Sequence, residues 1–286
     1  MSEITMIGLG AMGAALAQAL LKAGQEMTVW NRSPKKMEPL VALGAKGTTD
    51  LGQALEASSR VMICITDYAA TSALLDQPGL PSILNRRTVI QFSTGTPKEA
   101  ANFDTWVRAQ GATYLDGAIM VNPASIGGDN AQLLVAGPEE TYERCQGLLS
   151  CLGGGLRYLG PNVRAAATLD LALLSYIECA IFGTINGVHI CESEGVSLEQ
   201  FADLLPDGAW GRSKVQPIHE NNFEVGAGGA TVDVIAAILR RLQDQARNAG
   251  INGEIPDLLS SLLQRAIKAG YGGEDTAAVI KVLRDT

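Results

Sequence analysis

The feature that most constrains this sequence is a glycine motif near its beginning. Residues 8–13 read G-L-G-A-M-G; a short apolar segment at 5–8 leads into them, and a helical pattern at 11–23 follows. In a strand–turn–helix unit, the first glycine allows the tight turn, the second lets the backbone approach a pyrophosphate, and the third lets helix and strand pack closely. The helix N-terminus then faces the phosphates. The sequence therefore predicts a dinucleotide site that includes Gly8, Leu9, Gly10, Ala11, Met12 and Gly13.

Short segments rich in β-branched residues alternate with helical segments over the first half of the chain, which predicts βαβ units and a mostly parallel sheet. No strand is predicted after Pro161. We therefore expect an α/β Rossmann domain over 1–161 and an all-α domain over 162–286, joined by a long interdomain helix at about 163–194. The predicted strands are 5–8, 27–30, 60–65, 88–92, 113–115 and 132–135, and the predicted helices are 11–23, 34–43, 50–57, 97–110, 139–149, 197–204, 210–221, 230–249, 256–269 and 274–284.

The predicted long helix is apolar nearly all round, which implies burial on several sides. It is long enough to span a bilayer, for which about 20 residues suffice, but Asp170, Glu178, Asn186 and His189 interrupt it. Because charges inside a membrane are costly, we expect a buried helix of a soluble protein and no membrane association. A monomer of this size has little room to enclose such a helix, so burial against a second subunit is favoured.

Net charge and residue counts exclude several classes of function. The net charge is −8 and the pI is about 4.9, so no general positive field favours nucleic acid or an anionic membrane. The five cysteines form an odd set without metal-ligand spacing, which favours reduced thiols and a cytoplasmic protein. The two histidines exclude a multi-histidine site, and we expect no metal. The N-terminus lacks a basic segment before its apolar stretch, so no signal peptide is expected.

The segment after the second predicted strand indicates which dinucleotide is bound. An NAD site usually has Asp or Glu there, about 20 residues after the glycines, to hold the ribose 2′-hydroxyl. This chain has W-N-R-S-P-K-K at 30–36 instead. Arg32, Ser33 and Lys36 would suit a 2′-phosphate, so NADP(H) is predicted; a solvated basic turn is the alternative. Asn31, together with Ile65, Thr66 and Ser93 at the ends of later strands, completes the predicted cofactor site.

These motifs together resemble a known superfamily. G-L-G-A-M-G, W-N-R-S-P-K-K, the strand end S-T-G-T-P at 93–97, the turn at Gly160 and the long helix are similar to the β-hydroxyacid dehydrogenases and to their relatives, the imine reductases. The resemblance covers essentially the whole chain. It implies a homodimer with exchanged long helices, in which the Rossmann domain of one subunit and the helices of the other form each site.

Two segments distinguish the two branches. β-Hydroxyacid dehydrogenases have a catalytic lysine near the start of the long helix, where this chain has Asp170 in the sequence T-L-D-L-A-L-L. A lysine suits a carbonyl that becomes an alkoxide, whereas a carboxylate attracts a cationic iminium. The dehydrogenases also use a D-A-P-V-S-G-G loop to bind the substrate carboxylate. This chain has G-A-I-M-V-N-P-A-S-I-G at 117–127, which resembles the apolar segment of imine reductases.

The resemblance implies three catalytic candidates. Asp170 would stabilise the iminium, and Glu178, which is eight residues further along the helix, would donate a proton if burial raised its pKa. Thr94 would bind the substrate nitrogen or a water. The alternatives are ion pairs of the two carboxylates with Arg164, Arg212 or Arg240, and a capping role of Thr94 for the helix at 97–110. Met120, Leu174 and Trp210 are the predicted pocket residues, although Trp210 could equally be core.

We therefore expect an imine reductase that uses NADPH to reduce C=N bonds of imines or iminium ions, cyclic ones included, to amines. Its partners would be a small imine or amine and a second copy of the chain. Two alternatives stay open: an atypical β-hydroxyacid dehydrogenase or carbonyl reductase that uses Asp170 in place of lysine, and a non-catalytic NADPH-binding protein.

Overall fold

The computed structural model of the protein describes residues 2–226 and 229–285. The chain forms two compact units, Met1–Asp170 and Leu171–Thr286. The division falls inside one continuous helix, α8 (Ala165–Ser193), which corresponds to the long helix predicted at 163–194.

The first unit is built on an eight-stranded sheet with the order β3-β2-β1-β4-β5-β6-β7-β8. Every neighbouring pair is parallel except β6 and β7, which are antiparallel. The predicted Rossmann-type α/β domain is therefore confirmed. The strands are β1 (Ile4–Ile7), β2 (Met27–Trp30), β3 (Lys46–Thr48), β4 (Arg60–Ile63), β5 (Thr88–Gln91), β6 (Thr113–Ile119), β7 (Gln132–Ala136) and β8 (Gly155–Tyr158).

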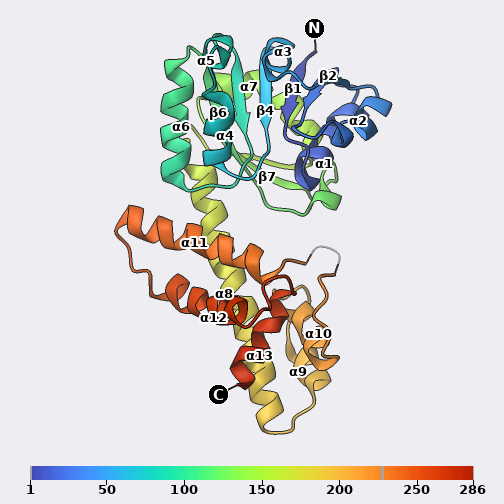
Figure 1. The fold of residues 1–286 in the computed structure, drawn as a ribbon, viewed down its shortest axis with the longest axis vertical. Helices are drawn as coiled ribbons and strands as arrows, with labels where there is room; N and C mark the ends of the chain where they lie inside the picture. The colour runs from blue at the N-terminus through green and yellow to red at the C-terminus, as the bar shows by residue number, and fades with distance from the viewer. Residues whose placement is uncertain (1, 227–228, 286) are drawn as a thin grey trace. The chain divides into compact units, whose positions relative to one another are not determined.

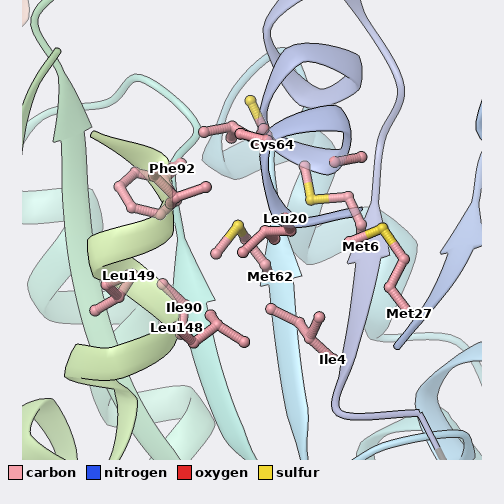
Figure 2. Packing of buried hydrophobic residues seen from close by; sticks show 14 of the residues in the cluster. Ile4, Met6, Leu20, Met27, Met62, Cys64, Ile90, Phe92, Leu148 and Leu149 are labelled. Atoms are coloured by element: carbon pink, nitrogen blue, oxygen red, sulfur yellow. The ribbon is translucent and has the colours of Figure 1, made fainter. Parts of the chain in front are cut away.

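Helices cover both faces of this sheet (Figure 1). Because strand side chains alternate between faces, neighbouring residues enter different cores. Met6 and Met62 belong to the cluster on the side of α1 and α7, whereas Ile7 and Ile63 belong to the cluster on the side of α3, α4 and α6. Figure 2 shows the first of these clusters, in which Leu20, Leu148 and Leu149 from the helices meet the strand residues. Both faces are therefore buried, as is usual for a parallel sheet.

The strand order places a topological switch point between β1 and β4. From β1 the chain adds β2 and β3 on one side of the sheet, and it then returns to add β4 and the later strands on the other side. Ligands of such sheets bind in the crevice at the carboxyl ends of the strands. The helices are α1 (Ala11–Lys22), η1 (Pro34–Lys36), α2 (Glu38–Ala42), α3 (Leu51–Glu56), α4 (Tyr68–Leu75), α5 (Leu80–Ile83), α6 (Pro97–Ala109), η2 (Pro123–Ser125), α7 (Glu139–Leu149) and η3 (Ser150–Leu152).

In the described residues of the second unit, the regular elements are helices, and the only β-pairing is an isolated bridge between Thr231 and Asp275. α11 and α12 pack against each other, and both contribute to the core of this unit (Figure 1). The helix predicted at 210–221 is shorter than expected, because η4 and α10 begin only after Gly211, which has a φ of +95°. The helices are α9 (Leu198–Leu204), η4 (Arg212–Lys214), α10 (Val215–His219), α11 (Val232–Ala249), α12 (Glu254–Lys268), η5 (Thr276–Ala278) and α13 (Val279–Arg284).

A regular stripe of exposed residues runs along the surface of α8, although the helix is apolar. The mean hydropathy of its most apolar window is 1.6, so it is long and apolar enough to cross a membrane, and 28% of that window is buried by this chain. The exposed positions between 169 and 190 are spaced alternately by three and four residues, which is the seam pattern of a coiled coil. The α8 stripe consists of Leu169, Ala172, Tyr176, Cys179, Gly183, Asn186 and Ile190.

Candidate active site

The glycine motif forms the turn between β1 and α1. Gly8 has a φ of +93°, and a Cβ there would collide with the side chain of Ile65. A Cβ on Gly13 would collide with the carbonyl oxygen of Gly8, so this glycine allows the helix to approach the strand. A Cβ on Gly10, the N-cap residue of α1, would meet nothing within 4 Å. The turn is therefore closed toward the protein and open on the side where the free amides of α1 would hold a pyrophosphate.

A groove with a volume of about 630 Å³ runs from this turn to exposed basic side chains at the end of β2. The amide of Leu9 donates a hydrogen bond to Oδ1 of Asn31 at 3.0 Å, which joins the two turns. Arg32, Ser33 and Lys36 are exposed along the groove, and its lining residues include no carboxylate. These residues therefore fit a dinucleotide with a 2′-phosphate. Of the predicted cofactor residues, all except Ser93 line this groove.

A smaller cavity adjoins the groove, and the two share Met12, Cys64 and Ile65. Its volume is about 210 Å³, which is less than the roughly 300–1,000 Å³ of most ligand pockets. Two carboxylic acids and no basic residue line it. The lining residues are Met12, Cys64, Ile65, Tyr68, Phe92, Ser93, Thr94, Gly95, Asp116, Gly117, Ala118, Ile119, Ala167 and Asp170.

Asp170 and Thr94, two of the predicted catalytic residues, both line this cavity. Asp170 reaches it from the second turn of α8, and Thr94 from the loop after β5. The helix that follows this loop, α6, is capped by Thr96, whose hydroxyl accepts the Glu99 amide in a capping box. The alternative in which Thr94 caps the helix at 97–110 is therefore wrong. Ser93 lines the cavity too, and its Oγ accepts the Ile65 amide at 3.0 Å.

The second carboxyl of the cavity, Asp116, was not predicted from the sequence. It lies on β6, two residues after Tyr114, so both side chains are on the same face of the sheet. Its Oδ1 accepts hydrogen bonds from the hydroxyls of Tyr68 and, at 2.8 Å, Tyr114, while its buried Oδ2 has no partner. Burial raises the pKa of Asp116 to about 7, although the two hydroxyls and the Ala167 backbone lower it; the charge of Asp170 raises it further.

Glu178, the third predicted catalytic residue, belongs to the helical unit and does not line the described cavity. Only 2% of it is exposed, and its Oε2 has no hydrogen-bond partner. Burial raises the pKa of Glu178 to about 7, and the positive charge of Lys214 lowers it. Nζ of Lys214 is already bound to both carboxylate oxygens of Asp275, at 2.8 and 2.9 Å. The positive charge that acts on the pKa of Glu178 therefore belongs to Lys214. Arg212, one of the predicted partners, pairs with Asp203 and Asp207 instead.

The predicted pocket residues do not meet at the described cavity. Met120 packs beside a small cluster at the end of β6, and its neighbour Ile119 lines the cavity instead. Leu174 packs against the core of the helical unit, and 49% of Trp210 is exposed in that unit. The substrate-binding role of these three residues stays a prediction.

Comparisons with known proteins cover the whole chain. Residues 3–160 match the family profile described as NAD binding domain of 6-phosphogluconate dehydrogenase. Residues 162–285 match that of the NADPH-dependent reductive aminase-like C-terminal domain. A curated NADPH-dependent reductive aminase from Aspergillus oryzae is 30% identical to this chain, over 99% of this chain and 97% of that protein.

The chain belongs to the family of NADPH-dependent reductive aminases and imine reductases. The family predicted from the sequence is therefore confirmed. Among solved structures, an imine reductase from Myxococcus stipitatus in complex with NADP⁺ is 32% identical, covers 98% of this chain and 99% of that chain, and has a TM-score of 0.69. A 3-hydroxyisobutyrate dehydrogenase from Salmonella typhimurium has a TM-score of 0.82 over 99% of this chain and all of that one, and at 19% identity this likeness shows the fold alone.

In this member of the reductase family, Asp116 is the functional candidate that sequence reasoning missed. A signal was present, since Tyr114 and Asp116 have the i, i+2 spacing that aligns side chains on a strand. The strand was predicted to end at residue 115, because Asp and Gly disfavour strands. In the structure β6 continues to Ile119, and the tyrosine hydroxyls supply the hydrogen bonds that a buried carboxyl needs.

Proposed function

We propose that this protein is an NADPH-dependent imine reductase that transfers hydride to the C=N bond of imines or iminium ions and releases amines. The observation that supports this most directly is the composition of the cavity wall. Asp170 and Thr94 line it together, and no basic side chain is among its described lining residues. A carboxylate attracts a cationic iminium, which a lysine would repel.

The groove residues would hold the cofactor, which supplies the hydride. The open turn at Gly10 would bind the pyrophosphate, and Arg32, Ser33 and Lys36 would bind the 2′-phosphate. The cavity that adjoins the groove would then receive the nicotinamide end, since the two share Met12 and Ile65.

Within the cavity, the Asp170 carboxylate would stabilise the positive charge on the substrate nitrogen, and the Thr94 hydroxyl would hydrogen-bond the nitrogen or a water. An iminium ion arrives with its positive charge, so its reduction needs no proton from the protein. A neutral imine needs one, and the family resemblance makes Glu178 the proposed donor. Its raised pKa would keep a proton available near neutral pH.

One assay separates this proposal from its alternatives. NADPH oxidation is followed with 2-methyl-1-pyrroline, and separately with a β-keto acid and an aldehyde acid. Turnover of the imine alone is expected. Turnover of an oxo acid alone would instead indicate an atypical β-hydroxyacid dehydrogenase or carbonyl reductase. Tight NADPH binding without turnover of any of these would indicate a non-catalytic NADPH-binding protein.

The cofactor preference has its own test. Arg32→Glu should raise the KM for NADPH by about 10- to 100-fold, the loss of a charge-assisted hydrogen bond, and change the KM for NADH much less. Lys35→Glu is the matched control, because Lys35 lies in the same exposed turn but does not line the groove. Equal changes for both cofactors in Arg32→Glu would contradict the NADP(H) assignment.

We further propose a homodimer in which the α8 stripe packs against a second copy of the chain. The support is the spacing of the stripe and the exposure of large apolar side chains within it, 62% for Tyr176 and 57% for Ile190. The small residues Ala172 and Gly183 would allow two helices to approach closely. Packing against a second copy would also cover the apolar surface of α8 that its own chain leaves exposed, so a membrane is not needed to explain this surface.

Light scattering should give a dimer for the native chain and a monomer for Gly183→Arg. Gly147→Arg on α7 is the matched control, since both glycines are exposed in helices and a Cβ at either would meet nothing within 4 Å. A native monomer at all concentrations would contradict the dimer.

We also propose a cytoplasmic location, which the five free cysteines support. Retention of activity only in an oxidising compartment would contradict it.

A further inference from the structure

The cavity wall contains a carboxyl that the proposed reaction does not use. Asp116 is 1% exposed, and its Oδ1 is bound to two tyrosine hydroxyls that are themselves 3.0 Å apart. The buried Oδ2 makes no hydrogen bond with any described residue. A buried polar atom without a partner is unfavourable, so an interaction that this oxygen gains with a bound molecule would be stabilising.

The charge that acts on Asp116 from the cavity wall is negative. Asp116 and Asp170 both line it, and no Lys, Arg or His is among its described lining residues. Asp170 raises the pKa of Asp116, so the two carboxyls interact electrostatically. No basic side chain among the described residues lowers the pKa of Asp116, so a positive charge that balances this carboxyl would come from a molecule that enters the cavity.

The shape of the first unit indicates which molecule this is. The groove of the glycine turn continues into the cavity at Met12, Cys64 and Ile65. If the phosphates of a dinucleotide lie at the glycine turn and its adenosine end at Arg32, the opposite end of the molecule enters the cavity beside Asp116. That end is the nicotinamide ring, which is a neutral dihydropyridine in NADPH and a positively charged pyridinium in NADP⁺.

We propose that Asp116 is a charge-compensating residue for the oxidised cofactor: its carboxyl loses a proton to solvent when a pyridinium ring occupies the cavity, and the Tyr68 and Tyr114 hydroxyls stabilise the carboxylate. This inference rests on the proposed use of NADP(H), but not on which substrate is reduced. Asp116 would thereby favour the charge distribution that exists after hydride transfer, while Asp170 acts on the substrate cation before it.

The other titratable groups near Asp116 do not offer the same response. Burial raises the pKa values of Tyr68 and Tyr114 well above 10 and that of Cys64 to about 12, so they keep their protons near neutral pH. Glu99 acts on Tyr68 from α6 and raises its pKa further. Asp170 is the remaining acid in the cavity wall, and it therefore needs a control of its own.

Comparing the two redox forms of the cofactor isolates this effect. Both contain the same phosphates, including a 2′-phosphate that titrates near pH 6, so its contribution cancels in the ratio of their dissociation constants. An opposite charge within about 4–6 Å lowers a carboxyl pKa by about 1–3 units. Affinity for NADP⁺ relative to NADPH should therefore rise by at least about tenfold between about pH 5.5 and about pH 8, and NADP⁺ binding should release a proton near pH 7.

The experiment measures both dissociation constants over this pH range by calorimetry, in two buffers of different ionisation enthalpy so that released protons are counted. Asp116→Asn keeps an oxygen that accepts the hydroxyls but cannot ionise, so its ratio should stay constant within about twofold. Asp170→Asn is the matched control in the same wall and should keep most of the pH dependence. A constant ratio in the native protein, or a pH dependence that Asp170→Asn removes and Asp116→Asn keeps, would overturn the inference.

A second variant decides the matter if Asp116→Asn fails to fold. Tyr114→Phe removes one donor to the carboxylate and should move the midpoint of the pH dependence upward. An unchanged midpoint would overturn the inference. If both cofactor forms bind and imines are reduced, but the ratio of the NADP⁺ and NADPH dissociation constants does not change with pH, only this inference fails. If neither form binds, the proposed function fails as well.

Discussion

Asp116 in the Rossmann unit and Glu178 in the helical unit show how differently two similar buried carboxyls can be used. Burial raises both pKa values to about 7, and each group has one oxygen without a hydrogen-bond partner. Asp116 has neutral hydroxyl donors and borders a cavity, whereas Glu178 lies near a buried lysine. A raised pKa alone therefore does not distinguish a ligand site from a packed charge cluster. The neighbours of the group and the space beside it make the distinction.

The largest expected effect concerns the cluster of the helical unit. Lys214→Met leaves Asp275 and Glu178 buried without their cation, so the free energy of unfolding should fall by about 3–5 kcal/mol. Urea unfolding measures it. Arg144→Met is the control, because its ion pair with Glu140 is exposed and should contribute at most about 1 kcal/mol. Equal losses in the two variants would show that the helical cluster is not a structural charge cluster.

The next prediction concerns activity at the cavity wall. Asp170→Ala should lower kcat/KM by at least about 10²-fold while the fold stays intact, because it removes the charge that stabilises the substrate cation. Steady-state kinetics with circular dichroism as a fold control measures this. A decrease of less than about threefold would mean that Asp170 is not a catalytic residue.

Two substrates test whether Glu178 donates a proton during the reaction. Glu178→Gln should slow the reduction of neutral 2-methyl-1-pyrroline by about 10-fold or more if Glu178 supplies the proton. It should leave the reduction of an N-methylated pyrrolinium, which needs no proton, nearly unchanged. Equal effects on both substrates would assign Glu178 to the structural cluster with Lys214.

The sequence predicted the dinucleotide groove better than it predicted either cluster. The glycine turn, the basic turn after β2 and the long helix each consist of residues that are close in sequence, so local spacing was informative. Lys214 and Asp275 are 61 residues apart, and only the tertiary fold brings them together. The strands β3 and β8 were missed because each is short and contains glycine, which disfavours strands.

The smallest expected effect is on stability as a function of pH. The pKa of Glu178 is about 7 in the folded protein and 4.5 ordinarily, so the folded state binds this proton more tightly. Its contribution to stability is therefore full below about pH 4.5 and is lost as the pH rises through about 7. Glu178→Gln removes this loss, and its melting temperature should gain on the native protein as the pH rises from about 5 to about 8. The corresponding gain in free energy is roughly 1–3 kcal/mol. A gain that is largest at low pH would contradict the burial of an ionisable Glu178.

The continuity of α8 limits how this chain can evolve. The helix contains Asp170 near its start, and its exposed stripe ends at Ile190. No loop interrupts the helix between Asp170 and the end of the stripe. Each inserted residue would turn everything after it by about 100° and shift it by about 1.5 Å. One insertion would thus move the stripe away from its face, whereas many substitutions would leave it in place. We expect relatives to vary freely in sequence along this helix but to keep the number of residues between the acid and the end of the stripe.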